Sequence, residues 1–236
     1  MSPLSLPLSA DELDAVLLDV DGTVLAEDIP LLEAACRRMA DASGGAATAE
    51  RIGTWWADRW FELCDLSSGD RFRLCSELLP QSIDDTVAHY GIRFEVAAWA
   101  EAITAYAGRA VPVPDAPDFI AEVPVPVCIV SNRDKDNLLA SLALAGLDGL
   151  DVVTSEDARA YKPLPRPFEM ALELTGTSPE RTLHIGDSYR ADVCGAAAVG
   201  IRTAWLNRDG KQPPPDATAN PDLVVRTLLE LVRAGR

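Results

Sequence analysis

Lysine and histidine are scarce in this chain, so the few positions that carry them stand out. Lysine occurs only at positions 135, 162 and 211, and histidine only at 89 and 184. The formal net charge is −16, and so acidic a surface argues against nucleic acids and anionic membranes as partners. An anionic substrate would have to be captured locally, against an unfavourable overall field.

Long apolar runs and paired cysteines are also missing. No window holds the ~18 consecutive apolar residues that a membrane span needs. The first residues lack the basic, apolar and small-residue progression of a signal peptide. The five cysteines contain no CxxC pair and are odd in number, which favours reduced thiols. We therefore expect a cytoplasmic protein that does not associate with membranes.

The chain does contain a long helical stretch between two regions of different character. A strand-like apolar run at 15–20 precedes residues 26–112, where no strand alternation occurs. Five prolines between residues 111 and 127 then mark a change of composition, typical of a chain that re-enters another domain. The length allows a core with an inserted smaller unit. We predict a catalytic core of residues 11–25 and 113–236 and a helical cap of residues 26–112.

Local signals divide the predicted cap into helices. One helix is expected at Ile29–Ala42, and Thr48 is placed to cap the next. A helix at Asp70–Leu79 is expected to stop at Pro80, and another to follow at Ser82–Tyr90. Beyond the proline-rich segment strands and helices alternate, which predicts an α/β fold with a parallel sheet and right-handed crossovers. Strands are expected at 127–130, 151–153, 182–185, 201–206 and 223–225, with a last helix to Ala234.

The first strand leads into two carboxylates, Asp19 and Asp21, which Gly22 and Thr23 follow at once. Positions i and i+2 of an extended segment face the same side, and open α/β sheets bind ligands at the carboxyl ends of their strands. Two carboxylates held this close repel each other unless one is protonated or a cation joins them. Mg²⁺ prefers such oxygen ligands, so the pair is a candidate metal site.

Other predicted strands also end in polar residues. These residues are Ser131 and Asn132 after the second strand, Asp187 after a later one, Asp192 five residues further on, and Lys162 before Pro163 in a loop between them. If the strands are parallel neighbours, all these groups converge at one edge of the sheet. Asp192 would stand in the first turn of its helix, where it could bind a metal-bound water or orient Lys162.

Such a gathering suits phosphoryl transfer. Asp19 would be the nucleophile, because carboxylates attack phosphorus to give an aspartyl-phosphate. Asp21 would protonate the leaving oxygen and later deprotonate water. Mg²⁺ would be held by Asp19, the backbone carbonyl of Asp21 and Asp187, and would neutralise charge on the phosphoryl group. Ser131 and nearby N–H groups would bind the phosphate, and Lys162 would add a positive charge.

The chain resembles the haloacid dehalogenase superfamily of hydrolases in four motifs of matching order and rough spacing. The motifs are Asp19-Val20-Asp21-Gly22-Thr23, Ser131-Asn132, Lys162-Pro163 and Gly186-Asp187-Ser188-Tyr189-Arg190-Ala191-Asp192. The resemblance implies a Rossmann-like core with a helical cap inserted after the first motif, Mg²⁺ dependence and, for most members, phosphatase activity. It also places Asn132 with Ser131 and Lys162 at the phosphate, and Asp192 in a supporting position.

Several activities of this superfamily have to be distinguished. 2-Haloacid dehalogenases need the same nucleophile but neither Mg²⁺ nor a proton for the halide, and they typically lack an acid at the position of Asp21. Phosphonate hydrolysis uses a cap lysine, and residues 24–114 contain none. A phosphomutase uses the same two aspartates and remains an alternative, and a non-catalytic binding protein is a more distant one. We predict a phosphatase acting on a small phosphorylated metabolite, because a cap closes over the leaving group. The motifs leave the substrate and the oligomeric state open.

A few residues near the motifs have two interpretations. Trp55 and Trp56 are adjacent and cannot share one helix face, so at least one should point away from the cap interior. Arg133 and Asp134 either reach the substrate or cap the helix that follows them. His184, within an apolar strand, is expected to be a hydrogen-bonded core residue.

Overall fold

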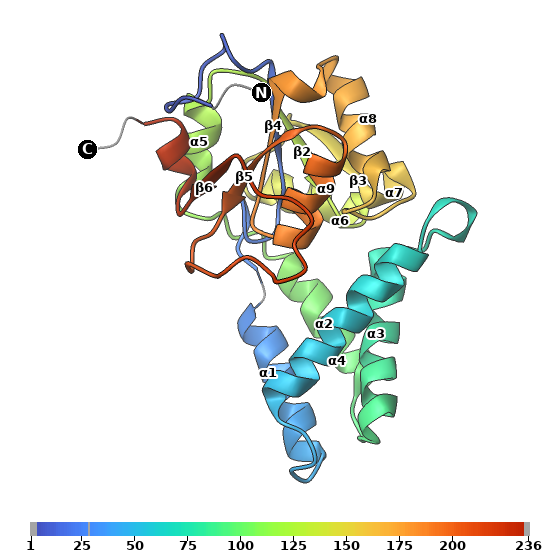
Figure 1. Ribbon diagram of the computed structural model, residues 1–236. Coiled ribbons are helices and arrows are strands. Elements are labelled where there is room, and N and C mark those ends of the chain that lie inside the picture. The colour runs from blue at the N-terminus through green and yellow to red at the C-terminus, as the bar shows by residue number, and fades with distance from the viewer. Residues whose placement is uncertain (1–3, 28, 234–236) are drawn as a thin grey trace.

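A six-stranded parallel sheet forms the centre of the molecule. The structure, a computed structural model, describes residues 4–27 and 29–233. The sheet has the order β3-β2-β1-β4-β5-β6, and every neighbouring pair is parallel (Figure 1). The strands are β1 (Ala15–Leu18), β2 (Val127–Ser131), β3 (Asp151–Thr154), β4 (Thr182–Gly186), β5 (Arg202–Leu206) and β6 (Leu223–Val225). The predicted α/β class and parallel sheet are confirmed.

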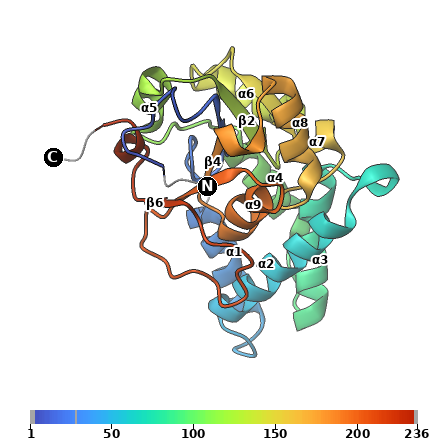
Figure 2. The same ribbon diagram turned by 45° about the horizontal axis from the view of Figure 1, so that its top comes forward.

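Helices cover both faces of the sheet. Side chains alternate along each strand, so successive residues pack against different faces. Val16 and Leu18 face a cluster that includes Phe119 of α5 (Ala116–Glu122) and Leu138 of α6 (Lys135–Leu144). Leu17, between them, packs on the other face with residues of the remaining core helices. Those helices are α8 (Pro165–Thr175) and α9 (Gly195–Ala198), and the short helix α7 (Ser155–Ala158) follows β3. Figure 2 shows α5 and α8 on opposite sides of the strands.

Four helices between β1 and α5 form a second unit with its own apolar core. They are α1 (Ile29–Ala42), α2 (Ala49–Leu66), α3 (Cys75–Tyr90) and α4 (Val96–Ala107), and Figure 1 shows them together below the sheet. Met39, Ile52, Trp56, Ile83 and Ile103 are buried among them. The side chain of Thr48 caps α2, as predicted, by accepting a hydrogen bond from the N–H of Arg51 at 3.3 Å. No helix of the described chain is long and apolar enough to cross a membrane.

The prediction that Pro80 ends a helix is wrong, because α3 runs through Pro80 without interruption. A proline inside a helix removes one hydrogen bond and crowds the preceding turn. Contacts with α2 on the following residues outweigh that cost. The indole Nε1 of Trp56 donates to Ser82 Oγ at 2.9 Å, and Arg59 Nε donates to Asp85 Oδ2 at 2.7 Å.

Three further differences follow from local geometry. The proline-rich segment contains helix α5, in which Pro117 stands in the first turn, where a proline is tolerated. The helix expected after Asp187 begins as a π-helical turn, Tyr189–Cys194, before α9. The last helix is a single 3₁₀ turn, Leu228–Leu231, and its predicted end at Ala234 lies outside the described residues.

The two segments that join the helical unit to the sheet lie side by side. Leu25 forms an antiparallel bridge with Pro112, the N–H of Ala26 donates to the carbonyl of Val111 at 2.9 Å, and the N–H of Val113 donates to the carbonyl of Val24 at 3.0 Å. This pairing anchors the entry and exit of the four helices at the end of β1, beside Asp19 and Asp21. The division of the chain into a core and a cap at residues 25 and 113 stays a prediction.

Candidate active site

The polar residues singled out in the sequence come together at the carboxyl edge of the sheet. Strand β1 lies between β2 and β4, so the residues that follow these three strands are neighbours. Asp19 and Asp21 follow β1, Ser131 ends β2 and Asp187 follows β4. Lys162 reaches the same place from the loop between α7 and α8.

Lys162 joins two carboxylates in the interior of the protein. Its Nζ donates to Asp19 Oδ1 at 2.7 Å and to Asp192 Oδ1 at 2.6 Å, and only 2% of the residue is exposed. Burial alone would lower the pKa of the ammonium, but the two carboxylates outweigh it and hold that pKa above its usual range. Lys162 is therefore a fixed positive charge beside the proposed nucleophile.

Asp192 holds Lys162 in place, and both of its oxygens accept hydrogen bonds from the protein. Its Oδ1 also contacts His184 Nε2 at 3.0 Å, and its Oδ2 accepts from the N–H of Ser188 at 3.0 Å. Burial would raise the pKa of Asp192, but Lys162 and His184 lower it below the ordinary range. A Cβ on Gly186 would lie 2.3 Å from Asp192 Cγ, so a glycine is needed there. These contacts favour the orienting role predicted for Asp192.

Asp187 is surrounded by negative charge. Burial, followed by the nearby carboxylates of Asp19 and Glu27, raises the pKa of Asp187 to about 9. Within the described part of the chain, no Lys or Arg nitrogen lies within ion-pair distance of its carboxylate. The indole Nε1 of Trp205 fixes the backbone by donating to the Asp187 carbonyl at 3.0 Å. Asp187 thus lacks the counter-charge that a bound cation would supply.

The donor set suits a hard divalent cation. One oxygen each from Asp19, Asp187 and Asp192 lies within 4.8 Å of the others. Because Asp192 is occupied by protein donors, Asp19 and Asp187 are the two carboxylates that would hold a metal. When all three carboxyl groups are ionised they face one ammonium, which leaves two negative charges for a divalent ion to balance. Gly22 allows this close approach, since a Cβ there would lie 2.6 Å from Asp187 Oδ2.

Asp21 is paired with Arg133. Arg133 Nε donates to Asp21 Oδ2 at 2.9 Å, and Nη2 donates to Oδ1 of the same carboxylate. Nη1 of Arg133 donates to the carbonyl of Ala107, at the end of α4, at 3.3 Å and to Ser141 Oγ at 3.2 Å. Sequence reasoning missed this pair, because its members are 112 positions apart and no local pattern links them.

Two residues of the second motif region have structural partners. The Asn132 side chain accepts from the Lys162 N–H at 2.7 Å and donates to the Lys162 carbonyl at 3.1 Å, so it positions the lysine loop. Its predicted phosphate-binding role stays a prediction. Ser131 is buried at the end of β2, and its Oγ accepts from the Arg133 N–H at 3.2 Å. Asp134 caps α3, by accepting from the N–H groups of Cys75 and Ser76, and not the helix that follows it.

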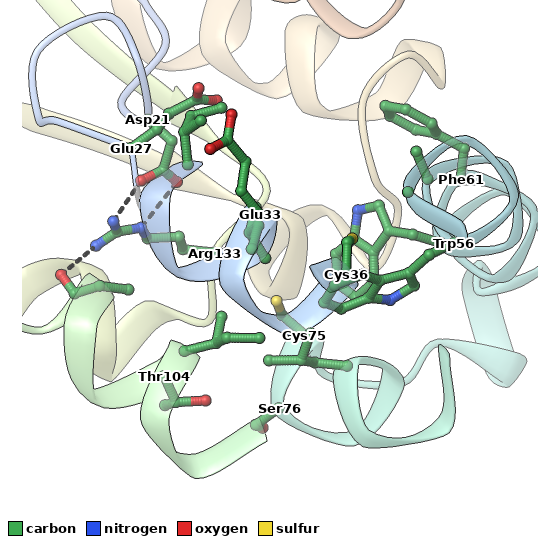
Figure 3. A pocket seen from close by; sticks show the side chains of 18 of the residues that line it. Asp21, Glu27, Glu33, Cys36, Trp56, Phe61, Cys75, Ser76, Thr104 and Arg133 are labelled. Carbon is green, nitrogen blue, oxygen red and sulfur yellow. Dashed lines mark hydrogen bonds and ion pairs between the residues drawn. The ribbon is translucent and has the colours of Figure 1, made fainter. Parts of the chain in front are cut away.

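A cavity of about 1210 Å³ lies between the helical unit and the sheet edge. Asp21 and Arg133 stand at one side of it, and Trp56 and Phe61 of α2 lie at the other (Figure 3). Trp56 is also part of the helical core, whereas the neighbouring Trp55 stacks on His89 with ring centroids 4.4 Å apart. The two adjacent tryptophans therefore do point in different directions.

Comparison with known proteins places this geometry in a family. The model of the haloacid dehalogenase-like hydrolases matches residues 13–200. The chain belongs to this family. The match covers the first strand, the helical unit and the sheet as far as Gly200, and so includes every residue predicted for the site. The chain is therefore a hydrolase of the haloacid dehalogenase-like type.

The relatives of this hydrolase differ in activity. A phosphoserine phosphatase from Thermus thermophilus is 35% identical over 126 residues, which are 51% of this chain and 50% of that protein. The chain thus spans about half the length of that relative. An (S)-2-haloacid dehalogenase 4A from Burkholderia cepacia is 26% identical over 215 residues, which are 86% of this chain and 87% of that protein. The fold matches that of the magnesium-bound HAD-hydrolase YfnB from Bacillus subtilis, with a TM-score of 0.67 and 24% identity over 93% of this chain and 97% of that one.

Replacing Asp187 with Asn is expected to weaken Mg²⁺ binding at least about tenfold, because one charged oxygen ligand is lost. The amide preserves the side-chain volume, and the Trp205 bond to the Asp187 backbone remains. Calorimetric titration with MgCl₂ measures the effect. Asp222→Asn is the matched control. The Asp222 carboxylate accepts a hydrogen bond from the Thr203 N–H, and the residue directly precedes β6. An unchanged titration of Asp187→Asn would remove this residue from the metal site.

The contribution of Asp187 to the stability of the metal-free protein is expected to fall as the pH rises from about 5 to 9. The pKa of Asp187 is about 9 in the fold, against an ordinary value of 3.8, so the folded state binds the proton more tightly over this interval. Unfolding therefore becomes easier as that proton is lost. Mg²⁺ competes with the proton, so its stabilising effect should grow over the same interval. Thermal unfolding at several pH values, with MgCl₂ or EDTA, tests this; a Mg²⁺ effect that is independent of pH would contradict it.

Proposed function

We propose that this hydrolase is a Mg²⁺-dependent phosphatase that acts on a small phosphorylated metabolite through an aspartyl-phosphate at Asp19. The observation that carries the proposal is the Asp187 carboxylate, half-buried beside Asp19 without a cationic partner in the described chain. Dehalogenation has no use for a divalent cation, whereas phosphoryl transfer does. The phosphatase among the relatives supports the same activity.

Each residue of the site has a defined task in this reaction. An oxygen of Asp19 forms a bond to phosphorus while the bond from phosphorus to the alcohol oxygen breaks, and Asp21 gives that oxygen its proton. Water then attacks the phosphorus, Asp21 takes up the proton of the water, and Asp19 is released as a carboxylate. Lys162 keeps Asp19 in position and offsets phosphate charge. A Mg²⁺ ion held by Asp19 and Asp187 would neutralise charge on the phosphoryl oxygens.

Asp21 has to leave Arg133 before it can act as an acid. Both oxygens of Asp21 accept hydrogen bonds from the guanidinium in this structure. A carboxylate in such a bidentate pair has no proton to give to a leaving group. Because 40% of the Asp21 side chain is exposed and faces the cavity, it is free to turn towards a substrate.

2-Haloacid dehalogenation is the second candidate, and two observations favour it. The dehalogenase relative covers nearly the whole chain, and the Arg133 contact occupies Asp21, which dehalogenation does not need. In that reaction an Asp19 oxygen would displace the halide from carbon to form an ester, and water would hydrolyse the ester. The presence of both Asp21 and Asp187 favours the phosphatase.

One assay separates these activities. The purified chain is incubated with a panel of phosphorylated metabolites in MgCl₂ or EDTA, and inorganic phosphate is measured. Parallel samples contain (S)-2-chloropropionate, and chloride is measured. Phosphate release that EDTA abolishes is the expected result. Chloride release in EDTA without phosphate release would establish the dehalogenase, and an isomerised phosphate ester without free phosphate would establish a phosphomutase.

A further inference from the structure

The cavity beside Asp21 has one apolar wall and one acidic wall. The apolar wall includes Trp56, Trp60 and Phe61 of α2, together with Cys36 and Cys75. In Figure 3, Trp56, Cys36 and Phe61 lie together on the side opposite Asp21. Aromatic rings of this kind bind flat or branched apolar groups. Because Asp21 protonates the leaving oxygen, the organic part of the substrate would extend from Asp21 into this space.

The acidic wall consists of carboxylates from the helical unit and from the segments around the sheet. Seven acidic residues line the cavity: Asp21, Glu27, Glu33, Glu50, Asp134, Asp136 and Glu156. Figure 3 shows Glu33 directed towards the region of Glu27 and Asp21. Negative charge on this wall repels an anionic group on the organic part of a substrate.

Within the described residues, only two cationic side chains line the same cavity, Arg37 and Arg133. Arg133 already donates to Asp21, to the Ala107 carbonyl and to Ser141, so all three of its nitrogens are engaged. Arg37 forms an exposed pair with Glu33 at 3.3 Å, one turn away on α1. The seven carboxylates of the cavity outnumber its two guanidinium groups, and both guanidinium groups are paired with carboxylates in this structure, so the cavity as a whole disfavours a carboxylate or a second phosphate on the substrate.

We infer that the substrate is a phosphate monoester whose organic part is apolar, of aryl size, and free of any second anionic group. This inference rests on the proposed phosphatase function and narrows its substrate class. It disfavours sugar bisphosphates, phosphorylated carboxylic acids and phosphorylated amino acids with a free carboxylate. A neutral or an amine-bearing organic part is compatible with the acidic wall.

Three esters of similar size that carry a different remote charge test the inference. They are 4-ethylphenyl phosphate, 4-(2-aminoethyl)phenyl phosphate and 4-(carboxymethyl)phenyl phosphate, in which methylene groups insulate the reacting oxygen from the charge. The carboxymethyl ester is expected to have a kcat/KM at least about tenfold below that of the ethyl ester, mainly through KM. The aminoethyl ester should equal or exceed the ethyl ester. A carboxymethyl ester as good as the ethyl ester would overturn the inference.

A variant pair tests whether the acidic wall causes the discrimination. Glu33→Gln should reduce the preference against the carboxymethyl ester by about threefold, because one charge of the wall is removed. Glu169→Gln is the matched control. Glu169 is also an exposed helical glutamate, and it lies 3.7 Å from Arg166. It belongs to α8 and does not line the cavity. An equal change in both variants would contradict the assignment of the effect to this wall.

Binding of the free phenols separates this inference from the proposed activity. Calorimetry measures the affinity of 4-ethylphenol, tyramine and 4-hydroxyphenylacetate without any catalytic step. If no ester releases phosphate but 4-hydroxyphenylacetate binds most weakly, the phosphatase proposal fails and the inferred cavity preference stands. If 4-hydroxyphenylacetate binds as tightly as 4-ethylphenol, the inferred preference fails whatever the activity.

Discussion

Asp19→Asn is expected to lower turnover by at least about 10⁴-fold while the protein stays folded. Asparagine has nearly the same volume as aspartate, and its amide oxygen can still accept the hydrogen bond of Lys162, now 2.7 Å from Asp19 Oδ1. The amide is not a nucleophile, so no bond to phosphorus, or to carbon in a dehalogenase, can form. The substitution therefore tests the nucleophile common to both candidate activities.

The stability of this variant gives a second measurement. Burial and the Asp192 carboxylate raise the pKa of Asp19 to about 7, so removing its charge relieves repulsion near Asp187. Thermal unfolding of metal-free Asp19→Asn should occur at the same temperature as in the parent protein or above it. Asp118→Asn, at an exposed residue of α5, is the matched control for the chemical change and should keep full activity. Retention of more than a tenth of the activity by Asp19→Asn would exclude the proposed mechanism.

Lys162→Met is expected to abolish activity and to destabilise the protein by about 3–5 kcal/mol. The methionine fills a similar volume, but Asp19 and Asp192 lose their common partner in the interior. An unpaired buried charge lowers the stability of a protein far more than an exposed ion pair raises it. Urea unfolding measures the loss. Lys211→Met, at an exposed residue 3.4 Å from Asp209, should change stability by less than about 0.5 kcal/mol.

A double variant keeps this prediction testable if Lys162→Met does not fold. Asp192→Asn in the Lys162→Met background removes one of the two uncompensated charges, so the double variant should recover part of the lost stability. A double-mutant cycle measures this coupling between the residues. If the double variant loses as much stability as Lys162→Met and Asp192→Asn lose together, the Lys162–Asp192 contact does not carry the effect.

The convergence of the site could be predicted because it depends on periodic patterns. Apolar runs that end in Asp19, Ser131 and Asp187 alternate with helical segments, and such alternation produces a parallel sheet whose strand ends share one edge. The position of β1 between β2 and β4 then makes these residues neighbours. Sequence order alone did not require that particular arrangement of strands, but the right-handed crossover rule limits the alternatives.

Contacts between distant segments could not be predicted in the same way. The pairing of Asp21 with Arg133, the capping of α3 by Asp134 and the continuity of α3 through Pro80 all depend on how the helical unit sits against its neighbours. Local rules gave the wrong answer at Pro80 because they weigh only the helix backbone, whereas packing against α2 decides the outcome.

The amino-acid sequence by itself determined the strand ends that carry the acids and the loop that carries the lysine, and hence the chemistry available to this hydrolase. Only the tertiary structure decided which carboxylates are paired and which are not: Asp192 and Asp21 have cationic partners, and Asp187 has none among the described residues. The physical reason is that an ion pair depends on distances of a few ångströms between segments far apart in the chain. Local sequence patterns report backbone conformation and burial but not those distances.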